Sequence, residues 1–307
     1  MAIKNKRVYF KKMYLGKKYN NNLSSEFDKI YRNFVRRKYN EIPELEFGDK
    51  KIYLSAIERR KLPSLDIVKG KGYVAYIYAL NIACVNLDEE IKYGNIDKEI
   101  DKRESIVEAQ GNEKHIGPLL DTQIVVYPNR GVIGTCRGVN RLNSWYIQKF
   151  LKEMLSSPAM QLQPILDKKG REDLEKYSVI KEVTYTVASP DKFKGYKDAN
   201  TSEMADLKFG EYLGGSELTL TLKGPNKENV VSKFKNLFAR RKGEQIKKFK
   251  IMGINEGVES TIDLIENLLI YEGNIDYEDK ITPKNYFDLL FYACVQRQSN
   301  LSEFWAL

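Results

Sequence analysis

The sequence predicts an α+β protein: a β-rich globular domain with helices, and a smaller inserted α/β domain. Three observations support this fold class. Several short runs are rich in β-branched and aromatic residues, which are typical of strands. Other stretches place apolar residues at helical spacing. With 307 residues, 42% of them hydrophobic, the chain is long enough and apolar enough to bury a large core.

The first domain is expected to begin with a strand and a helix. Residues 7–20 predict a β segment that ends in a glycine turn, and residues 24–39 predict a helix with Ser24 and Ser25 as candidate N-caps. The apolar face of this helix would hold Phe27, Ile30, Tyr31, Phe34 and Val35. The opposite face would carry Lys29, Arg32, Arg36 and Arg37. Such a helix is basic enough to lie along a phosphate backbone.

The next part of the chain alternates strands with a polar segment. Residues 50–58 and 72–85 predict strands, the second of them central in a sheet. Residues 86–118 alternate acidic and basic side chains and predict an exposed excursion of helix and loop.

Residues 125–151, VVYPNRGVIGTCRGVNRLNSWYIQKFL, contain three glycines whose role is structural. They lack the GxxxxGK[ST] spacing of a phosphate-binding loop and the GxGxxG spacing of a dinucleotide fold. Residues 122–127 and 132–137 instead predict a hairpin with Gly131 in its turn. A helix is expected to start near Asn143.

The second half predicts a compact unit of its own. It has a charged helix, strands and an amphipathic helix at residues 168–177, 179–188, 216–222, 226–242 and 245–254. Residues 260–273 fit helix or strand, and a strand is favoured.

A last helix begins with Thr282 as N-cap and Pro283 at its first position. Because this helix is amphipathic, whereas the inserted unit already has its own helix and strands, the last helix is assigned to the first domain. We therefore expect residues 1–178 with 279–307 to form one basic domain, and residues 179–278 to form the other.

Positive charge is concentrated in two segments. The chain carries +9 overall, but residues 1–72 hold 19 Lys and Arg against eight Asp and Glu, and residues 226–250 hold nine against two. A clustered excess favours a polyanionic partner, because each neutralised phosphate releases counterions. Solubilising surface lysine is the alternative interpretation.

The charge pattern predicts DNA binding through the phosphate backbone. No helix-turn-helix, zinc finger or RNA-binding signature is present, so contacts that do not depend on base sequence are expected. Arg130 is expected to project into solvent from a hairpin tip, whereas Arg137 fits a phosphate contact and an internal ion pair equally well. The candidate DNA-binding residues are Lys11, Lys12, Lys17, Lys18, Arg32, Arg36, Arg37, Arg130, Arg141, Arg240, Arg241, Lys242, Lys247 and Lys248.

Catalytic and metal-binding patterns are scarce. His115 is the only histidine, so no histidine-based triad or cluster is expected. A metal-dependent nuclease needs only a few carboxylates, for which Glu46, Asp49 and Glu182 are the candidates. Alternating charge at strand edges explains these three residues more simply. We expect no catalytic residue, metal or cofactor, and keep the nuclease as the alternative.

The cysteines and the apolar runs bear on the compartment. Cys84, Cys136 and Cys294 are isolated and odd in number, which predicts neither a disulfide framework nor a zinc site and favours the reducing cytoplasm. No apolar run is long enough to span a bilayer, and the first residues lack the apolar stretch of a leader peptide.

The order of these blocks resembles that of the RexA-like exclusion proteins of lambdoid phages and their prophage relatives. The resemblance runs nearly the full length, from the basic N-terminal segment through VIGTCR, LQPIL, VIKEVTYTV and SELTLTL to the last helix ending in ACVQRQ. A DNA-ring protein and other defence proteins of similar build fit the arrangement too.

This resemblance implies a cytoplasmic, non-enzymatic DNA-binding protein that acts in phage exclusion or abortive infection. It also implies a second domain that moves relative to the first, a homodimer, and a membrane-protein partner that carries out growth arrest. The expected function is therefore sequence-tolerant DNA binding in antiviral defence. A metal-dependent nuclease and a scaffold that meets an acidic protein are the alternatives.

Overall fold

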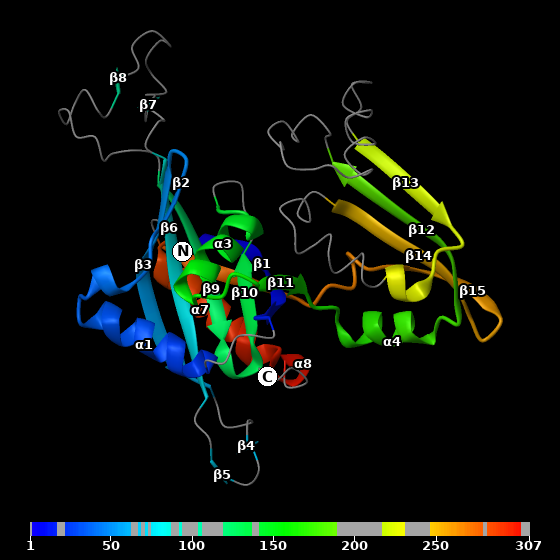
Figure 1. Cartoon of the computed structure of the whole chain (residues 1–307), viewed down its shortest axis with the longest axis horizontal. Helices are drawn as coiled ribbons and strands as arrows, with labels where there is room; N and C mark the ends of the chain where they lie inside the picture. The colour runs from blue at the N-terminus through cyan, green and yellow to red at the C-terminus, as the bar shows by residue number, and fades with distance from the viewer. Residues whose placement is uncertain are drawn as a thin grey trace. The chain divides into compact units, whose positions relative to one another are not determined.

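The computed structural model describes residues 2–16, 22–62, 67–68, 71–72, 75–86, 92–93, 104–105, 119–136, 141–188, 217–230, 246–278 and 281–301 (Figure 1). Mixed helices and antiparallel sheets confirm the predicted β-rich α+β fold class. The chain forms two compact units: unit 1 comprises Met1–Gln161 and Tyr271–Leu307, and unit 2 comprises Leu162–Ile270.

Unit 2 thus starts and ends earlier than the predicted range of 179–278. The reason is a pairing between two distant segments of unit 2. The backbone N–H of Asp167 donates to the carbonyl of Asn267, and the N–H of Leu269 donates to the carbonyl of Ile165. These bonds tie the segment before the charged helix to unit 2, although its sequence carries no local sign of them.

The larger sheet has eight strands, most of which belong to unit 1, and all its pairs from β1 through β2 are antiparallel. The strand order is β11-β1-β10-β9-β6-β3-β2, and β16 also pairs with β1. The strands are β1 (Ala2–Tyr14), β2 (Leu45–Phe47), β3 (Lys50–Lys61), β6 (Tyr76–Asn86), β9 (Leu119–Tyr127), β10 (Val132–Cys136), β11 (Gln161–Pro164) and β16 (Ile270–Tyr277).

Helices lie on both faces of this sheet (Figure 1). Helix α1 (Leu23–Val35) packs on the face of Tyr78, whose ring lies 5.8 Å from that of Phe27. Helix α3 (Ser144–Met154) packs on the same face. Ser144 contacts Lys11, and the strand pairings place the side chain of Lys11 on the same face of the sheet as Tyr78. Helix α7 (Pro283–Gln296) contacts β6, β9 and β10 from the other face and is followed by α8 (Gln298–Leu301).

The helix starts follow from their capping residues. Asn143 accepts hydrogen bonds from the first backbone N–H groups of α3, which confirms that this helix starts near Asn143 as predicted. At α7, the Asn285 side chain accepts from the backbone N–H of Thr282 at 2.9 Å, and Pro283 is the first helical residue. For α1 the predicted caps were wrong: Asn22, rather than Ser24 or Ser25, is the N-cap. Val35, predicted to be on its apolar face, is 59% exposed.

The predicted hairpin at residues 122–137 is confirmed for residues 122–136. Strands β9 and β10 pair with Val132 opposite Tyr127, and a short 3-10 turn, η3 (Pro128–Arg130), joins them. Gly131 closes the turn with φ 56, a left-handed conformation that glycine adopts without a steric penalty.

Within the predicted excursion at residues 86–118, only the backbones of β7 (Lys92–Tyr93) and β8 (Glu104–Ser105) are described beyond the end of β6, and they pair with each other. Strands β4 (Ile67–Val68) and β5 (Lys71–Gly72) form another short pair.

Unit 2 is a four-stranded antiparallel sheet in the order β13-β12-β14-β15. The strands are β12 (Val179–Ala188), β13 (Glu217–Lys223), β14 (Ile246–Asn255) and β15 (Val258–Asp263), and α4 (Lys168–Lys176) contacts β15. The predicted strand at 179–188 is confirmed, and residues 260–273 span the end of β15, a turn and the start of β16. The predicted helix at 226–242 is described only for its first turn, residues 227–230.

Two general properties concern the whole described chain. Among the described residues, no helix is both long enough and apolar enough to cross a bilayer. Cys84, Cys136 and Cys294 are buried free thiols. Burial raises the pKa of Cys136 to about 11 and that of Cys294 to about 12, so these thiols remain protonated and unreactive at neutral pH.

Candidate nucleic-acid interface

Helix α1 ends in Arg36, Arg37 and Lys38, which we call the basic turn. The N–H of Arg37 donates to the Phe34 carbonyl at 3.0 Å, and the N–H of Lys38 donates to the Asn33 carbonyl at 2.9 Å. These two bonds form a Schellman motif, which places the residue after the C-cap in the left-handed region. Arg37 accordingly has φ 58. This conformation costs an L-residue about 1–2 kcal/mol and is usually supplied by glycine.

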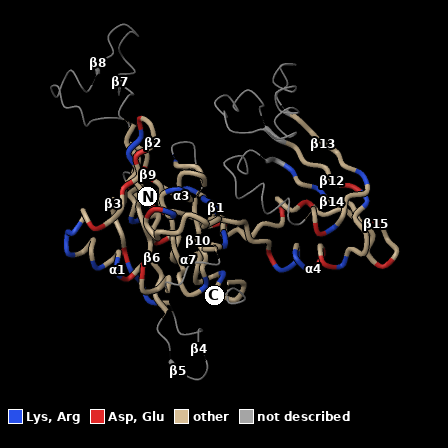
Figure 2. The backbone as a smooth tube through the Cα atoms, in the orientation of Figure 1, with Lys and Arg blue, Asp and Glu red and all other residues tan. Residues whose placement is uncertain are grey.

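An arginine kept in a strained conformation is a candidate functional residue. Arg36 and Arg37 are both exposed, and within the described part of the chain neither guanidinium group has an ion-pair partner. Arg32 differs, because its Nη2 lies 3.0 Å from the Asp28 carboxylate. Figure 2 shows the Lys and Arg positions along α1 and the segment that follows it. The basic turn therefore offers two free cations at one helix end.

Two of the predicted DNA contacts are buried. Arg130 is only 2% exposed, so the expectation that it projects into solvent was wrong. The tip of the β9–β10 hairpin is covered, because α1 packs against η3 and the Ser24 hydroxyl donates to the Asn129 side chain. Lys11 is 3% exposed, and its Nζ donates to the Ser144 hydroxyl at the start of α3. Neither side chain is placed to reach a phosphate in this fold.

Two further candidates are engaged within unit 1. The Nζ of Lys12 donates to the carbonyl of Arg130 at 2.7 Å, and its burial, together with the nearby Arg130 charge, lowers the pKa of Lys12 to about 8. The guanidinium of Arg141 lies 4.1 Å from the centre of the Tyr286 ring, a cation–π contact with α7. Both residues stabilise the fold as placed, which makes them weaker candidates than the basic turn.

Several predicted residues fall outside the described part of the chain. These are Lys17, Lys18, Arg137, Arg240, Arg241 and Lys242, together with His115. Lys247 lies in β14, but its side chain is also outside the described part.

In unit 2 one face of the sheet carries two exposed lysines beside four threonines, of which Thr186 is buried. Lys248 and Lys250 are exposed at alternate positions of β14 and pair in register with Thr186 and Thr184 of β12. The hydroxyls of Thr184 and Thr221 are 3.2 Å apart, and those of Thr186 and Thr219 are 3.0 Å apart. Two lysines beside a ladder of hydroxyls can contact phosphates by charge and by hydrogen bond. Lys248 thus stays a candidate, and Lys250 joins it.

The candidate carboxylates of the nuclease alternative belong to different units. Glu46 is exposed on β2, and Asp49 follows β2 with its carboxylate 3.6 Å from the Nζ of Lys50. Glu182 belongs to β12 of unit 2. Over the described ranges, no three His, Cys, Asp or Glu side chains are grouped so that they could hold a metal ion.

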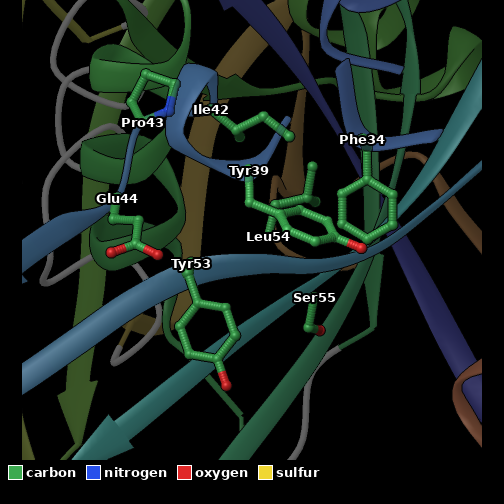
Figure 3. A pocket seen from close by; sticks show the side chains of 8 residues that line it. All are labelled: Phe34, Tyr39, Ile42, Pro43, Glu44, Tyr53, Leu54 and Ser55. Carbon is green, nitrogen blue, oxygen red and sulfur yellow. The ribbon is translucent and has the colours of Figure 1, made fainter. Parts of the chain in front are cut away.

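Sequence reasoning missed a hollow of about 360 Å³ next to the basic turn (Figure 3). It is lined by residues that include Phe34 of α1, Tyr39 of η1 (Tyr39–Glu41), Glu44, and Tyr53 of β3. The available signal was the pair of aromatic residues, Phe34 and Tyr39, on either side of the three basic residues. Local sequence could not show that β3 brings Tyr53 to the same place.

No protein-family model matches the chain, and no curated protein does.

Proposed function

We propose that this protein binds DNA through its phosphate backbone, without reading base sequence, and acts in a phage exclusion or abortive-infection system. The observation that carries the DNA-binding part is the basic turn. Arg36 and Arg37 are exposed and have no ion-pair partner among the described residues, and Arg37 is held at the helix end at a cost in backbone energy. Lys248 and Lys250 supply a second positive segment.

The defence part of the proposal rests on the resemblance to the RexA-like exclusion proteins. From it we infer action in the cytoplasm, a homodimer, and a membrane-protein effector, with no catalysis by this chain. A positive, partly hydroxylated surface without a base-reading motif is consistent with a protein that recognises DNA as a polyanion.

The test of DNA binding is a double variant, Arg36→Gln with Arg37→Gln. Both side chains are exposed, so the variant should keep the wild-type melting temperature. If each arginine neutralises one phosphate, the slope of log K against log salt should flatten by about 0.9 per contact. Affinity at 0.1 M salt should then fall roughly tenfold per contact, for every duplex sequence alike. Fluorescence anisotropy over a salt titration with two unrelated duplexes measures both quantities.

The matched control is Lys168→Gln with Lys169→Gln in α4, which removes the same charge from two exposed positions of unit 2. It should leave the slope unchanged. A double Arg36 and Arg37 variant with wild-type affinity at every salt concentration would contradict the proposal, and so would a loss confined to one DNA sequence.

Replacing Arg37 by glycine should raise stability while it weakens DNA binding. Glycine adopts φ 58 without strain, so the free energy of unfolding should rise by about 0.5–1 kcal/mol in urea denaturation. Ser156, with φ 50, ends α3 in the same motif through hydrogen bonds from Ser156 to Glu153 and from Ser157 to Lys152. Ser156→Gly should give a similar gain in stability with unchanged affinity. Equal losses of affinity in both variants would show that the effect does not come from the Arg37 charge.

A further inference from the structure

The hollow beside the basic turn has the size and the lining of a small ligand site. Its volume of about 360 Å³ is at the lower end of the range for such sites. The Phe34 and Tyr39 rings pack edge to face, with centroids 5.4 Å apart and planes at 73°. Figure 3 shows these two rings side by side near Leu54, with the Tyr53 ring and the Glu44 carboxylate farther from them. Aromatic faces of this kind are the surfaces on which nucleobases stack.

Tyr39 is both fixed and accessible. Its ring is held against Phe34, yet the residue remains 52% exposed. An aromatic ring that is already ordered loses little conformational entropy when a planar ligand stacks on it. The hollow is therefore preorganised for a flat, apolar-faced ligand.

The basic turn connects two of the residues that line the hollow. Phe34 and Tyr39 both line the hollow. In the chain, Val35 and the basic turn (Arg36, Arg37 and Lys38) lie between these two aromatic residues. Lys38 is ion-paired with Glu41 at 2.6 Å, so the two free cations of the turn are Arg36 and Arg37. A ligand bound in the hollow can therefore place a negatively charged group next to Arg36 and Arg37.

The charge inside the hollow determines which part of a nucleotide enters it. Glu44 lines the hollow, and its carboxylate lies 2.6 Å from the Nζ of Lys51. A carboxylate repels a phosphate, but it accepts hydrogen bonds from base amino groups. The base therefore belongs in the hollow and the phosphate belongs at Arg36 and Arg37.

A base within a duplex cannot reach such a site unless it leaves the stack, which costs a few kcal/mol. We propose that the hollow binds one unpaired base of single-stranded DNA, whose adjoining phosphate lies on the basic turn. This inference rests on the proposed DNA binding and adds a preference for single strands to it. Sequence preference remains low, because every base has a face that can stack.

The test compares three DNA ligands of equal length: a single-stranded oligonucleotide, the same strand with abasic sites throughout its centre, and the duplex. Wild-type protein should bind the single strand more tightly than the abasic strand. Tyr39→Ala should lower affinity for the single strand by roughly 5- to 150-fold, which corresponds to the loss of one stacking contact, and leave duplex binding unchanged. Tyr39→Phe should restore single-strand binding, because stacking needs only the ring.

Tyr292→Ala is the matched control, since Tyr292 of α7 is also 52% exposed and also packs edge to face, against Tyr271. It should bind all three ligands as wild type does. If wild type binds the intact and abasic strands equally, or if Tyr39→Ala keeps full single-strand affinity, the hollow is not a base site. In that case DNA binding that still depends on Arg36 and Arg37 would leave the proposed function standing. Absence of any DNA binding at low salt would overturn both proposals.

Discussion

Arg130→Ala should unfold far more easily than the wild-type protein. Arg130 is among the largest fully buried side chains of the described structure, so its truncation to alanine leaves a cavity in the interior. By comparison with other large buried side chains, the free energy of unfolding should fall by roughly 2–5 kcal/mol. Both tryptophans lie in the residue ranges of unit 1, so tryptophan fluorescence during urea unfolding follows the unit that contains Arg130.

Two other arginine variants make this result specific. Arg130→Met keeps much of the volume but removes the charge, so it should fall between alanine and wild type. Arg36→Ala removes an exposed arginine from the same unit and should change the free energy of unfolding by less than about 0.5 kcal/mol. An Arg130→Ala protein that unfolds at the wild-type urea concentration would mean that the hairpin tip is open to solvent.

Gly253→Val should selectively destabilise unit 2. A Cβ atom at Gly253 would lie 2.8 Å from the ring of Tyr177 and 2.8 Å from the carbonyl oxygen of Val179 on the neighbouring strand. The ring could shift, but the carbonyl belongs to the paired backbone of β12 and cannot move without breaking the sheet. Overpacking of this kind costs about 1–3 kcal/mol, and here the strand pairing itself is strained as well. We expect a loss of about 3 kcal/mol.

Hydrogen exchange locates this effect. The amides of β12 and β14 should exchange faster in Gly253→Val, whereas the unfolding of unit 1 by tryptophan fluorescence should be unchanged. Thr261→Val, at an exposed position of β15, introduces the same side chain where space is open and should leave exchange close to wild type. Protection of β14 in Gly253→Val that equals the wild-type value would show that the two strands can separate at no cost.

Much of the fold follows from local sequence signals. The last helix could be predicted because Thr282 and Pro283 mark its start, and β12 because its residues alternate and favour strands. The N-cap of α1 could not be identified from the local sequence, because Asn22, Ser24 and Ser25 are all good capping residues. The choice depends on where the chain leaves its extended conformation, and that point is set by packing.

The candidate site was harder to predict, because burial of a basic residue depends on distant segments. Arg130 follows a proline and an asparagine in a turn, a pattern typical of exposed loops, yet α1 covers that turn from more than a hundred residues away in the sequence. Lys11 is buried for the same reason, by contact with Ser144. Arg36 and Arg37 were correctly predicted to be exposed, but the prediction kept them inside a helix that continues to Tyr39. Helix α1 instead ends at Val35, and the left-handed turn that follows it could not be foreseen without a glycine.

The position of α7 in the chain affects how the protein folds during synthesis. Strands β6, β9 and β10, whose face α7 covers, are all translated by Cys136, whereas α7 begins only at Pro283. At about 5–20 residues per second, the ribosome needs about 7–30 s to produce the intervening chain. During that interval one apolar face of the sheet has no helix to cover it, while unit 2 can already fold. A nascent chain stalled before residue 283 should therefore engage chaperones that bind exposed apolar surface, and release should follow once α7 has emerged.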